Sequence, residues 1–133
     1  MTNIRYTADE PISTEQFIGV LEASGLAERR PTEDKGCISE MLQYADLLVT
    51  AWRDAKLVGV ARTVTDFSYC AYLSDLAVDR TCQSSGIGRH LIRHTRQHLG
   101  PRCTLILLSA PAAVDYYPKV GFERHPQAWI MKP

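Results

Sequence analysis

The sequence predicts a single α/β domain with a mixed, mostly antiparallel central sheet and helices on both faces. The first observation is a series of apolar runs between residues 47 and 78, separated by short polar turns, which predicts consecutive hairpins. The second is a strand, a glycine turn, a helix and another strand over residues 69–108, an order that predicts a right-handed parallel crossover. A length of 133 residues suits one domain spanning residues 1–133.

The first half of the chain is expected to contain a strand, two helices and a hairpin. Ser13 or Thr14 can cap the first helix, Gly25 lies near its end, and apolar residues recur on one side between them. The polar residues 53–56 form the turn of the hairpin. In chain order these elements cover residues 4–6, 11–26, 33–44, 47–52 and 57–65.

The second half is expected to continue with a central strand, a helix, a buried strand, a short helix and two final strands. The strand over residues 69–78 is apolar throughout, which is typical of a strand with neighbours on both sides. Gly100 and Pro101 end the long helix, and both Trp52 and Trp129 are expected to pack in strands. In chain order these elements cover residues 69–78, 86–99, 104–108, 112–120, 121–124 and 128–131.

Composition narrows the classes of function. Lys and Arg together number 15, as do Asp and Glu, and this lack of net charge argues against a nucleic-acid partner. No apolar run approaches the roughly 20 residues of a membrane span. The N-terminal segment MTNIRYTADE is unlike a signal peptide, so we expect no membrane partner and a cytoplasmic location. The cysteines, expected to be reduced and mostly buried, are Cys37, Cys70, Cys82 and Cys103.

The segment CQSSGIGRHL, residues 82–91, lies where an apolar strand ends and a helix begins. Such a turn exposes the first unpaired N–H groups of the helix, which together with the helix dipole favour a phosphate group. Gly86 and Gly88 let a ligand approach closely, and Arg89 can add a charged contact. The spacing does not match a Walker A loop, because no Gly-Lys-Ser/Thr follows, and it does not match G-x-G-x-x-G, because Leu91 stands at the place of the third glycine. From these residues alone, a phosphate site and a plain tight turn are equally supported.

Two motifs resemble the GCN5-related N-acetyltransferase (GNAT) superfamily, in particular its small bacterial single-domain members. QSSGIG, residues 83–88, resembles the Q/R-x-x-G-x-G/A motif, and YLSDLAVDRTC, residues 72–82, resembles the strand before it. DYYPKVGFERH, residues 115–125, resembles the family's fYeklGF segment. The resemblance implies the acyl-CoA N-acyltransferase fold, in which the strands matching residues 72–78 and 104–108 are a parallel pair that splays apart.

The resemblance also implies acetyl-CoA as co-substrate and no metal. In this family the backbone amides of the glycine turn bind the diphosphate of CoA. The preceding strand pairs with the pantetheine arm, and an N–H near Leu76 would face the thioester carbonyl. Many relatives bind pantetheine with an asparagine that is replaced by Ala110 in this chain. The cofactor-binding residues implied are Leu76, Ala77, Val78, Gln83, Ser84, Ser85, Gly86, Ile87, Gly88 and Arg89.

The catalytic residues implied are Tyr117 and Asp75. Tyr117 matches the family's general acid, which protonates the departing thiolate. The glutamate bases of relatives align with Tyr72 or Ser74, neither of which is acidic, and Asp75 is the nearest carboxylate. Asp75 either accepts a proton or attracts a cationic substrate, or it makes a structural hydrogen bond at a strand bulge. A water chain, or loss of the proton before binding, would replace a dedicated base.

The function implied is direct acetyl transfer from acetyl-CoA to a primary amine in a ternary complex. The amine belongs to a small molecule or peptide, residues 11–45 border its pocket, and a homodimer is a further expectation. One alternative is a non-catalytic acyl-CoA sensor or interaction module. Another is a toxin that acetylates aminoacyl-tRNA, against which the neutral charge counts. His90, His94 and His98 recur along one helix flank, where we expect solvated side chains rather than a metal site.

Overall fold

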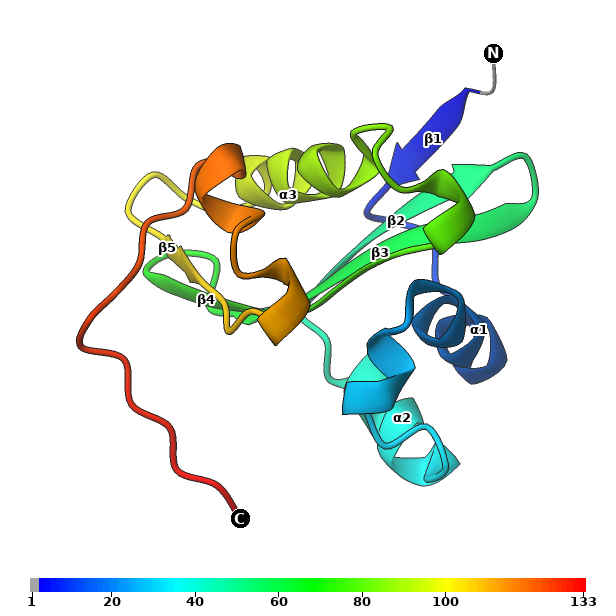
Figure 1. The fold of residues 1–133 in the computed structure, drawn as a ribbon, viewed down its shortest axis with the longest axis horizontal. Helices are drawn as coiled ribbons and strands as arrows, with labels where there is room; N and C mark the ends of the chain where they lie inside the picture. Colours follow the sequence, from blue (N-terminus) through cyan, green and yellow to red (C-terminus); the bar gives the residue numbers. More distant parts are fainter. Residues whose placement is uncertain (1–2) are drawn as a thin grey trace.

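The computed structural model describes residues 3–133, so residues 1–2 of the predicted domain lie outside the described range. The chain forms a five-stranded sheet in the order β1-β2-β3-β4-β5 (Figure 1). The first three strand pairs are antiparallel and the β4–β5 pair is parallel. The strands are β1 (Ile4–Thr7), β2 (Leu47–Arg53), β3 (Lys56–Thr65), β4 (Cys70–Val78) and β5 (Thr104–Ile106). The helices are α1 (Thr14–Ser24), α2 (Lys35–Gln43) and α3 (Ile87–Gln97), with shorter 3-10 turns η1 (Leu26–Arg29), η2 (Arg80–Cys82), η3 (Pro111–Ala113) and η4 (Tyr117–Val120).

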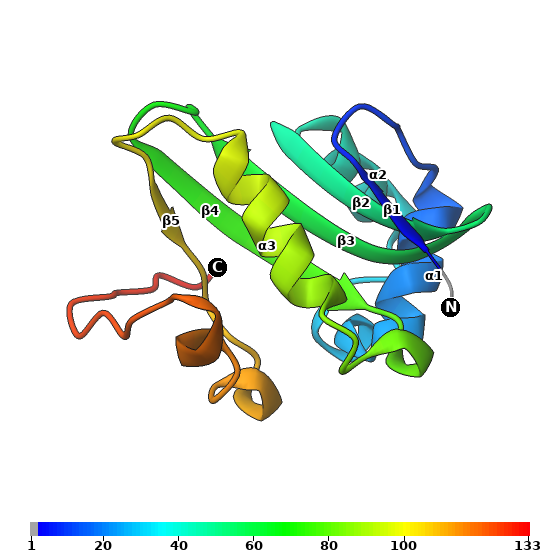
Figure 2. The ribbon, with the colours of Figure 1, turned by 90° about the horizontal axis from the view of Figure 1, so that it is seen from above.

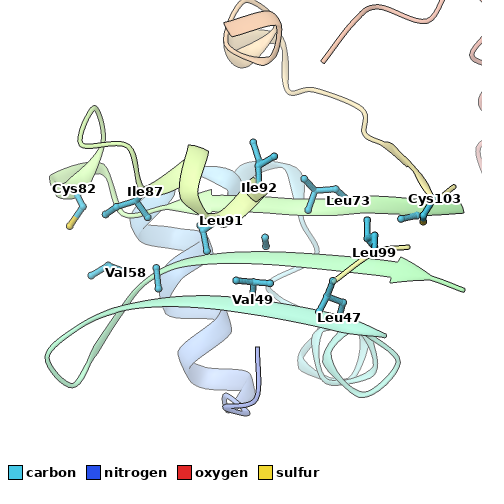
Figure 3. Packing of buried hydrophobic residues seen from close by; sticks show 13 residues of the cluster. Leu47, Val49, Val58, Leu73, Cys82, Ile87, Leu91, Ile92, Leu99 and Cys103 are labelled. Carbon is cyan, nitrogen blue, oxygen red and sulfur yellow. The ribbon is translucent and has the colours of Figure 1, made fainter. Parts of the chain in front are cut away.

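Helices cover both faces of the sheet, as predicted (Figure 1, Figure 2). α3 packs on one face, where Leu91 meets core residues of β2, β3 and β4 (Figure 3). α1 and α2 pack on the other face, where Phe17 and Ile38 lie in a second cluster with Val60 of β3. The next residue, Ala61, belongs to the cluster under α3. Successive side chains of β3 thus point to opposite faces of the sheet, and both faces are covered by helices.

The ends of the first two helices are set by local capping. The hydroxyl of Ser13 accepts a hydrogen bond from the Gln16 N–H at 3.0 Å, and the Gln16 side chain accepts one from the Ser13 N–H at 2.9 Å. Ser13 is therefore the cap and α1 begins directly after it. Gly25, at φ 87°, ends α1. Asp34 caps α2 with its side chain, so this helix begins after Asp34 rather than at the predicted residue 33.

The predicted buried strand over residues 104–108 is shorter and more exposed than expected. β5 pairs with β4 from Cys70↔Thr104 to Tyr72↔Ile106 and then turns away. Ile106 is 50% exposed, and β5 is the last strand in the sheet order, with a single neighbouring strand. An apolar run predicts a strand but not its place in the sheet, so the prediction of burial is wrong.

The predicted helix over residues 112–120 and the two final strands are also wrong. The single turns η3 and η4 stand in place of the helix, because Pro118 cannot donate the N–H that a continuous helix needs. Residues 121–133 run without a hydrogen-bonded neighbouring strand, which β-structure requires. Trp129 is 96% exposed and does not pack in a strand, whereas Trp52 is buried in β2 as predicted.

All four cysteines are free thiols. Cys82 and Cys103 are buried, as predicted, and belong to the core cluster under α3. Cys37 is half-buried and Cys70 is exposed. The prediction of buried cysteines is therefore confirmed for Cys82 and Cys103 and wrong for Cys70.

Replacing Trp129 by serine should change the free energy of unfolding by less than about 0.5 kcal/mol, because substitutions of surface residues away from packed features have small effects. Replacing Trp52 by alanine should cost about 3–5 kcal/mol, because its ring is buried and its Nε1–H donates to Thr50 Oγ1 at 2.8 Å. Urea unfolding followed by circular dichroism at low protein concentration compares the two variants. A loss of several kcal/mol from Trp129→Ser would place the C-terminal segment in a packed strand and contradict this description.

Candidate active site

β4 and β5 form a V that is closed at one end. They pair from Cys70 to Tyr72 on β4, whereas Leu73 and residues 75–78 pair with β3 alone. Figure 2 shows β5 leaving β4 at this point. This confirms the splayed parallel pair that the family resemblance implied. Because no described strand lies beside that part of β4, its outward N–H and C=O groups can pair with an extended ligand.

The turn after β4 is anchored by Asp79. Its carboxylate accepts hydrogen bonds from the backbone N–H and the Oγ1 of Thr81 at 2.9 and 2.8 Å. Its own N–H donates to Val58 O at 2.8 Å, and Lys56 Nζ lies 3.4 Å from the carboxylate. The backbone hydrogen bond from Thr81 is the largest cause that lowers the pKa of Asp79, and burial opposes it. The start of the turn is therefore fixed to β3.

The glycine turn forms a concave row of backbone N–H groups at the start of α3. Ser84 and Gly86 adopt left-handed backbone conformations, with φ of 68° and 85°, and alternation of hand along a chain points successive N–H groups to one side. Within residues 3–133, no backbone N–H from Ser84 to Arg89 donates to a protein acceptor. Open donors at a helix N-terminus bind anions, so this turn fits a phosphate group.

Gly88 lies against the phenol of Tyr116, which comes from the segment between η3 and η4. A methyl group at Gly88 would stand 2.6 Å from Tyr116 Oη and 3.9 Å from Val78 Cγ2, so the lack of a side chain at Gly88 lets the phenol lie this close to the start of α3. Burial raises the pKa of Tyr116, and the charge of Arg89 opposes the shift. The phenol therefore keeps its proton at neutral pH and can donate a hydrogen bond to an anion at the head of α3.

Tyr117 packs edge-on against two aromatic rings, those of Tyr116 and Phe122, with centroid separations of 5.3 and 5.6 Å. Burial is the main cause that raises its pKa above the usual 10.0. The neighbouring Tyr116 adds to the increase in pKa, and the guanidinium of Arg30 opposes it. The phenol of Tyr117 thus stays protonated through the neutral range and is available as a proton donor.

Asp75 lies at a bulge in β4 and is bound by two guanidinium groups. The pairing of β3 with β4 skips Ser74. The carboxylate of Asp75 is fully buried, and the Nε groups of Arg30 and Arg62 each donate to one of its oxygens. Arg62 also donates to Ser74 Oγ at 2.9 Å, and Arg30 donates to Ser74 O at 2.7 Å. The two arginines therefore hold the bulge in place.

This arrangement bears on the two roles expected for Asp75. An acceptor amine would have to displace a guanidinium to reach the carboxylate, because the side chain has no exposed surface. The contacts therefore favour the structural role at the bulge over the role of a general base. The catalytic assignment of Asp75, like that of Tyr117, stays a prediction.

A protein-family model described as an acetyltransferase (GNAT) domain matches residues 21–130, which is most of the chain.

This chain belongs to the GNAT acetyltransferase family.

The curated relatives of this GNAT chain include two plant proteins from Arabidopsis thaliana. GCN5-related N-acetyltransferase 1, chloroplastic, is 28% identical over 121 residues, which are 88% of this chain and 59% of that protein. GCN5-related N-acetyltransferase 2, chloroplastic, is 31% identical over 77 residues, which are 56% of this chain and 30% of that protein. The chain thus spans less than two thirds of the length of either relative.

Solved structures share the GNAT fold over nearly the whole chain. A GNAT-family acetyltransferase from Streptococcus pneumoniae superposes with a TM-score of 0.75 at 21% identity, covering 98% of this chain and all of that one. A second structure is that of an aminoglycoside acetyltransferase from an uncultured soil metagenomic sample, solved with sisomicin. It superposes with a TM-score of 0.67 at 20% identity, covering 98% of this chain and 94% of that one. At these identities the likeness establishes the fold.

The cofactor-binding residues implied for a GNAT domain lie along one continuous path. Leu76 and Val78 pack toward α3, and Ala77 between them packs toward α1. The turn from Ser84 to Arg89 follows at the end of this strand. The side chain of Gln83 is turned back, because its Nε2 donates to Val78 O at 3.0 Å. The contact of these residues with acetyl-CoA stays a prediction.

Sequence reasoning missed the two arginines at the bulge. Arg62 stands within the apolar run GVARTV, and a charged side chain there requires a buried partner of opposite sign. Asp75 on the next strand is that partner, so this signal was present in the sequence. Arg30 gives no comparable signal, because it lies in the polar connection between the first two helices, which contains many charged residues.

The histidines of α3 form a flank beside β1. The ring centroid of Tyr6 lies 5.4 Å from that of His90 and 5.0 Å from that of His94. Burial lowers the pKa of His94, and the nearby His90, His98 and Arg93 lower it further. His94 is thus packed against an aromatic ring rather than fully solvated.

Residues 3–133 lack the features of two other classes of site. No group of three or more His, Cys, Asp or Glu side chains is arranged to hold a metal ion. In the same part of the chain, no helix combines the length and apolar character needed to cross a membrane.

Asp79→Asn should lower the free energy of unfolding at neutral pH by about 1 kcal/mol, because the hydrogen bonds from Thr81 and the contact with Lys56 lose their negatively charged partner. The folded-state pKa of Asp79 lies below its usual 3.8. Its contribution to stability is therefore fully present above that value and is lost as the pH falls through the folded-state pKa. The difference in unfolding free energy between the native protein and the variant should narrow below pH 3.8.

Urea unfolding at a series of pH values from neutral to acidic measures this difference. Asp54→Asn, at an exposed position in the turn between β2 and β3, is the matched control. A difference for Asp79→Asn that stays constant down to the lowest pH would contradict this role of the Asp79 charge.

Proposed function

We propose that this GNAT domain transfers the acetyl group of acetyl-CoA to a primary amine by direct attack. The observation that carries the proposal is the row of open backbone N–H groups from Ser84 to Arg89, which directly follows the open edge of β4. The row suits the diphosphate of CoA, and the edge suits its extended pantetheine arm. If the segment were only a tight turn, the N–H groups from Ser84 to Arg89 would have no hydrogen-bond acceptor in the protein.

Acetyl-CoA fits the residues that are present. Because Gly88 has no side chain, the phenol of Tyr116 lies beside the start of α3, where it can donate a hydrogen bond to a phosphate bound by the amides. Arg89 supplies a positive charge beside it, and its Nη2 reaches Lys119 O at 3.5 Å, which links α3 to η4. The pantetheine arm would pair with β4 near Leu76 and Val78. When bound, acetyl-CoA supplies the activated acyl carbon, and the chain positions it.

The transfer forms a C–N bond and breaks a C–S bond. A neutral amine attacks the thioester carbonyl, and a backbone N–H near Leu76 stabilises the charge that develops on oxygen. The thiolate leaves and takes the proton of the Tyr117 phenol, which water then restores. The proton lost by the amine goes to water, because the carboxylate of Asp75 is held by Arg30 and Arg62.

A non-catalytic acyl-CoA sensor is the second candidate. Ala110 in place of the family's asparagine favours it, because one side-chain contact to the cofactor is absent. The paired state of Asp75 also favours it, because the nearest carboxylate on β4 is occupied. Release of thiol from acetyl-CoA in the presence of amines separates the two functions, since a sensor binds the thioester without turnover.

The acceptor amine, the homodimer and the cytoplasmic location stay predictions, as does the lack of a nucleic-acid or membrane partner. The two plant relatives are named as chloroplastic proteins, and one fold neighbour is named an aminoglycoside acetyltransferase. Compartment and acceptor therefore vary among proteins that share this fold, and neither is transferred to this chain.

CoA should bind at least about a hundredfold more tightly than pantetheine, because pantetheine lacks the diphosphate and each charged hydrogen bond contributes about 1.5–3 kcal/mol. Isothermal titration calorimetry of both ligands measures the ratio. Dephospho-CoA, which keeps the diphosphate, is the control and should bind within about tenfold of CoA. Equal affinity for CoA and pantetheine would contradict the role of the turn, and no binding by any of the three would overturn the proposed function.

Tyr117→Phe should lower kcat by about 10²–10⁴, because the departing thiolate loses its proton donor. The Kd for CoA should stay within a few-fold of the native value, because the phenol does not hold the diphosphate. Thiol release under saturating acetyl-CoA measures kcat, and Tyr44→Phe, at an exposed tyrosine, is the control. An unchanged kcat would show that Tyr117 is not the acid.

A further inference from the structure

Arg30, Arg62 and Asp75 form a cluster at the β4 bulge in which two positive charges face one negative charge. Asp75 supplies one carboxylate with no exposed surface, and two guanidinium groups bind it. Among residues 3–133, neither Arg30 nor Arg62 forms an ion pair with a second carboxylate. A surplus charge in a buried place is unfavourable unless a group of opposite sign approaches it.

The surplus charge is accessible through Arg30. The side chain of Arg62 is 9% exposed, whereas that of Arg30 is 21% exposed. A guanidinium has five N–H donors, and Arg30 uses its three nitrogens toward Asp75, Ser74 O and Arg29 O. Each of its two terminal nitrogens donates to one protein acceptor and therefore keeps one further N–H for an anion.

Arg30 lies at the β4 bulge, at the end of η1 in the segment expected to border the acceptor. It is hydrogen-bonded to the backbone of Ser74 at the bulge, and it is near enough to Tyr117 for its charge to act on that phenol. Tyr72 and Ser74, the positions where relatives place a glutamate, hold no acid in this chain. A cationic amine that enters between the bulge and Tyr117 therefore meets a positive charge rather than a carboxylate.

We propose that the acceptor is an amine with a carboxylate or phosphate group close to its nitrogen, and that Arg30 is the specificity-determining residue that binds this anion. The inference rests on the proposed acetyl transfer and names its substrate class. The planar fork of a guanidinium matches both anions with two parallel N–H donors. The same surplus charge disfavours polyamines and other amines that carry additional positive charges.

Matched pairs of amines test the preference. One pair is an amino acid and its amide, and the other is phosphoethanolamine and ethanolamine, so that each pair differs in the anion. Values of kcat/KM from thiol release, expressed per neutral amine, should favour the anionic member by about ten- to hundredfold, as expected for hydrogen bonds to a charged group. The pair with the larger ratio identifies the anion as carboxylate or phosphate.

Arg30→Gln should reduce the ratio within each pair to about one, whereas Arg30→Lys should keep part of it, because the charge remains and the fork is lost. Arg29→Gln, at the exposed neighbouring position, is the matched control and should leave the ratio unchanged. Thermal unfolding and CoA affinity of each variant report whether the fold and the cofactor site are intact. If Arg30→Gln does not fold, the test rests on the kcat/KM ratio of the native protein and on its decrease in Arg30→Lys.

The outcomes separate the two proposals. Equal kcat/KM within both pairs, or a ratio that Arg30→Gln leaves unchanged, would overturn the anion preference while turnover itself supports acetyl transfer. A higher kcat/KM for a polyamine such as spermidine would also overturn it. If CoA binds but no amine of any charge releases thiol, the acetyl transfer fails and the substrate class fails with it.

Discussion

The divergence of β5 from β4 is the constraint on which the candidate site depends. β4 keeps a neighbour on its second edge only from Cys70 to Tyr72, and the rest of that edge is left to a ligand. α3 packs closely on the neighbouring strand β3 because Gly59 of β3 has no side chain: a methyl group there would lie 3.1 Å from Leu91 Cδ1. The N-terminus of α3 follows the last residues of β4 through a short turn, so its open amides lie at the wide end of the V (Figure 2). The departure of β5 thus leaves an unpaired edge of β4 next to a helix N-terminus with open N–H groups.

The bulge at Ser74 connects this V to the helices on the other face. Arg30 comes from the connection between α1 and α2, and Arg62 donates to Met41 O of α2 at 3.3 Å. Both meet at Asp75, so the helices that should border the acceptor are tied to the strand that should hold the thioester. Removing one partner of a buried ion pair is strongly destabilising, because the other charge is left uncompensated. The network therefore ties η1 and α2 to the bulge in β4.

The sequence was informative where local chemistry determines structure. The cap at Ser13, the turn at residues 53–56 and the glycine turn are each fixed by a few neighbouring residues, and all form as predicted. The segment after β5 could not be predicted in this way, because a β-like pattern such as that around Trp129 forms a strand only if another strand lies beside it. For the site, motifs located the turn and Tyr117, but the role of Asp75 depends on partners that are distant in sequence. No spacing rule connects Arg30 to Asp75, since the contact exists only once η1 and β4 are packed together.

The lack of a glutamate on β4 and the surplus guanidinium have one physical consequence. In solution the carboxylate of an amino acid stabilises its own ammonium group, which keeps the nitrogen protonated and unreactive. If Arg30 binds that carboxylate, the stabilisation is cancelled, because the anion is already paired and a cation lies nearby. The neutral amine then becomes easier to form, and water suffices to take the proton. A chain without a carboxylate at Tyr72 or Ser74 can in this way replace a general base by electrostatics, provided that its substrate brings the anion.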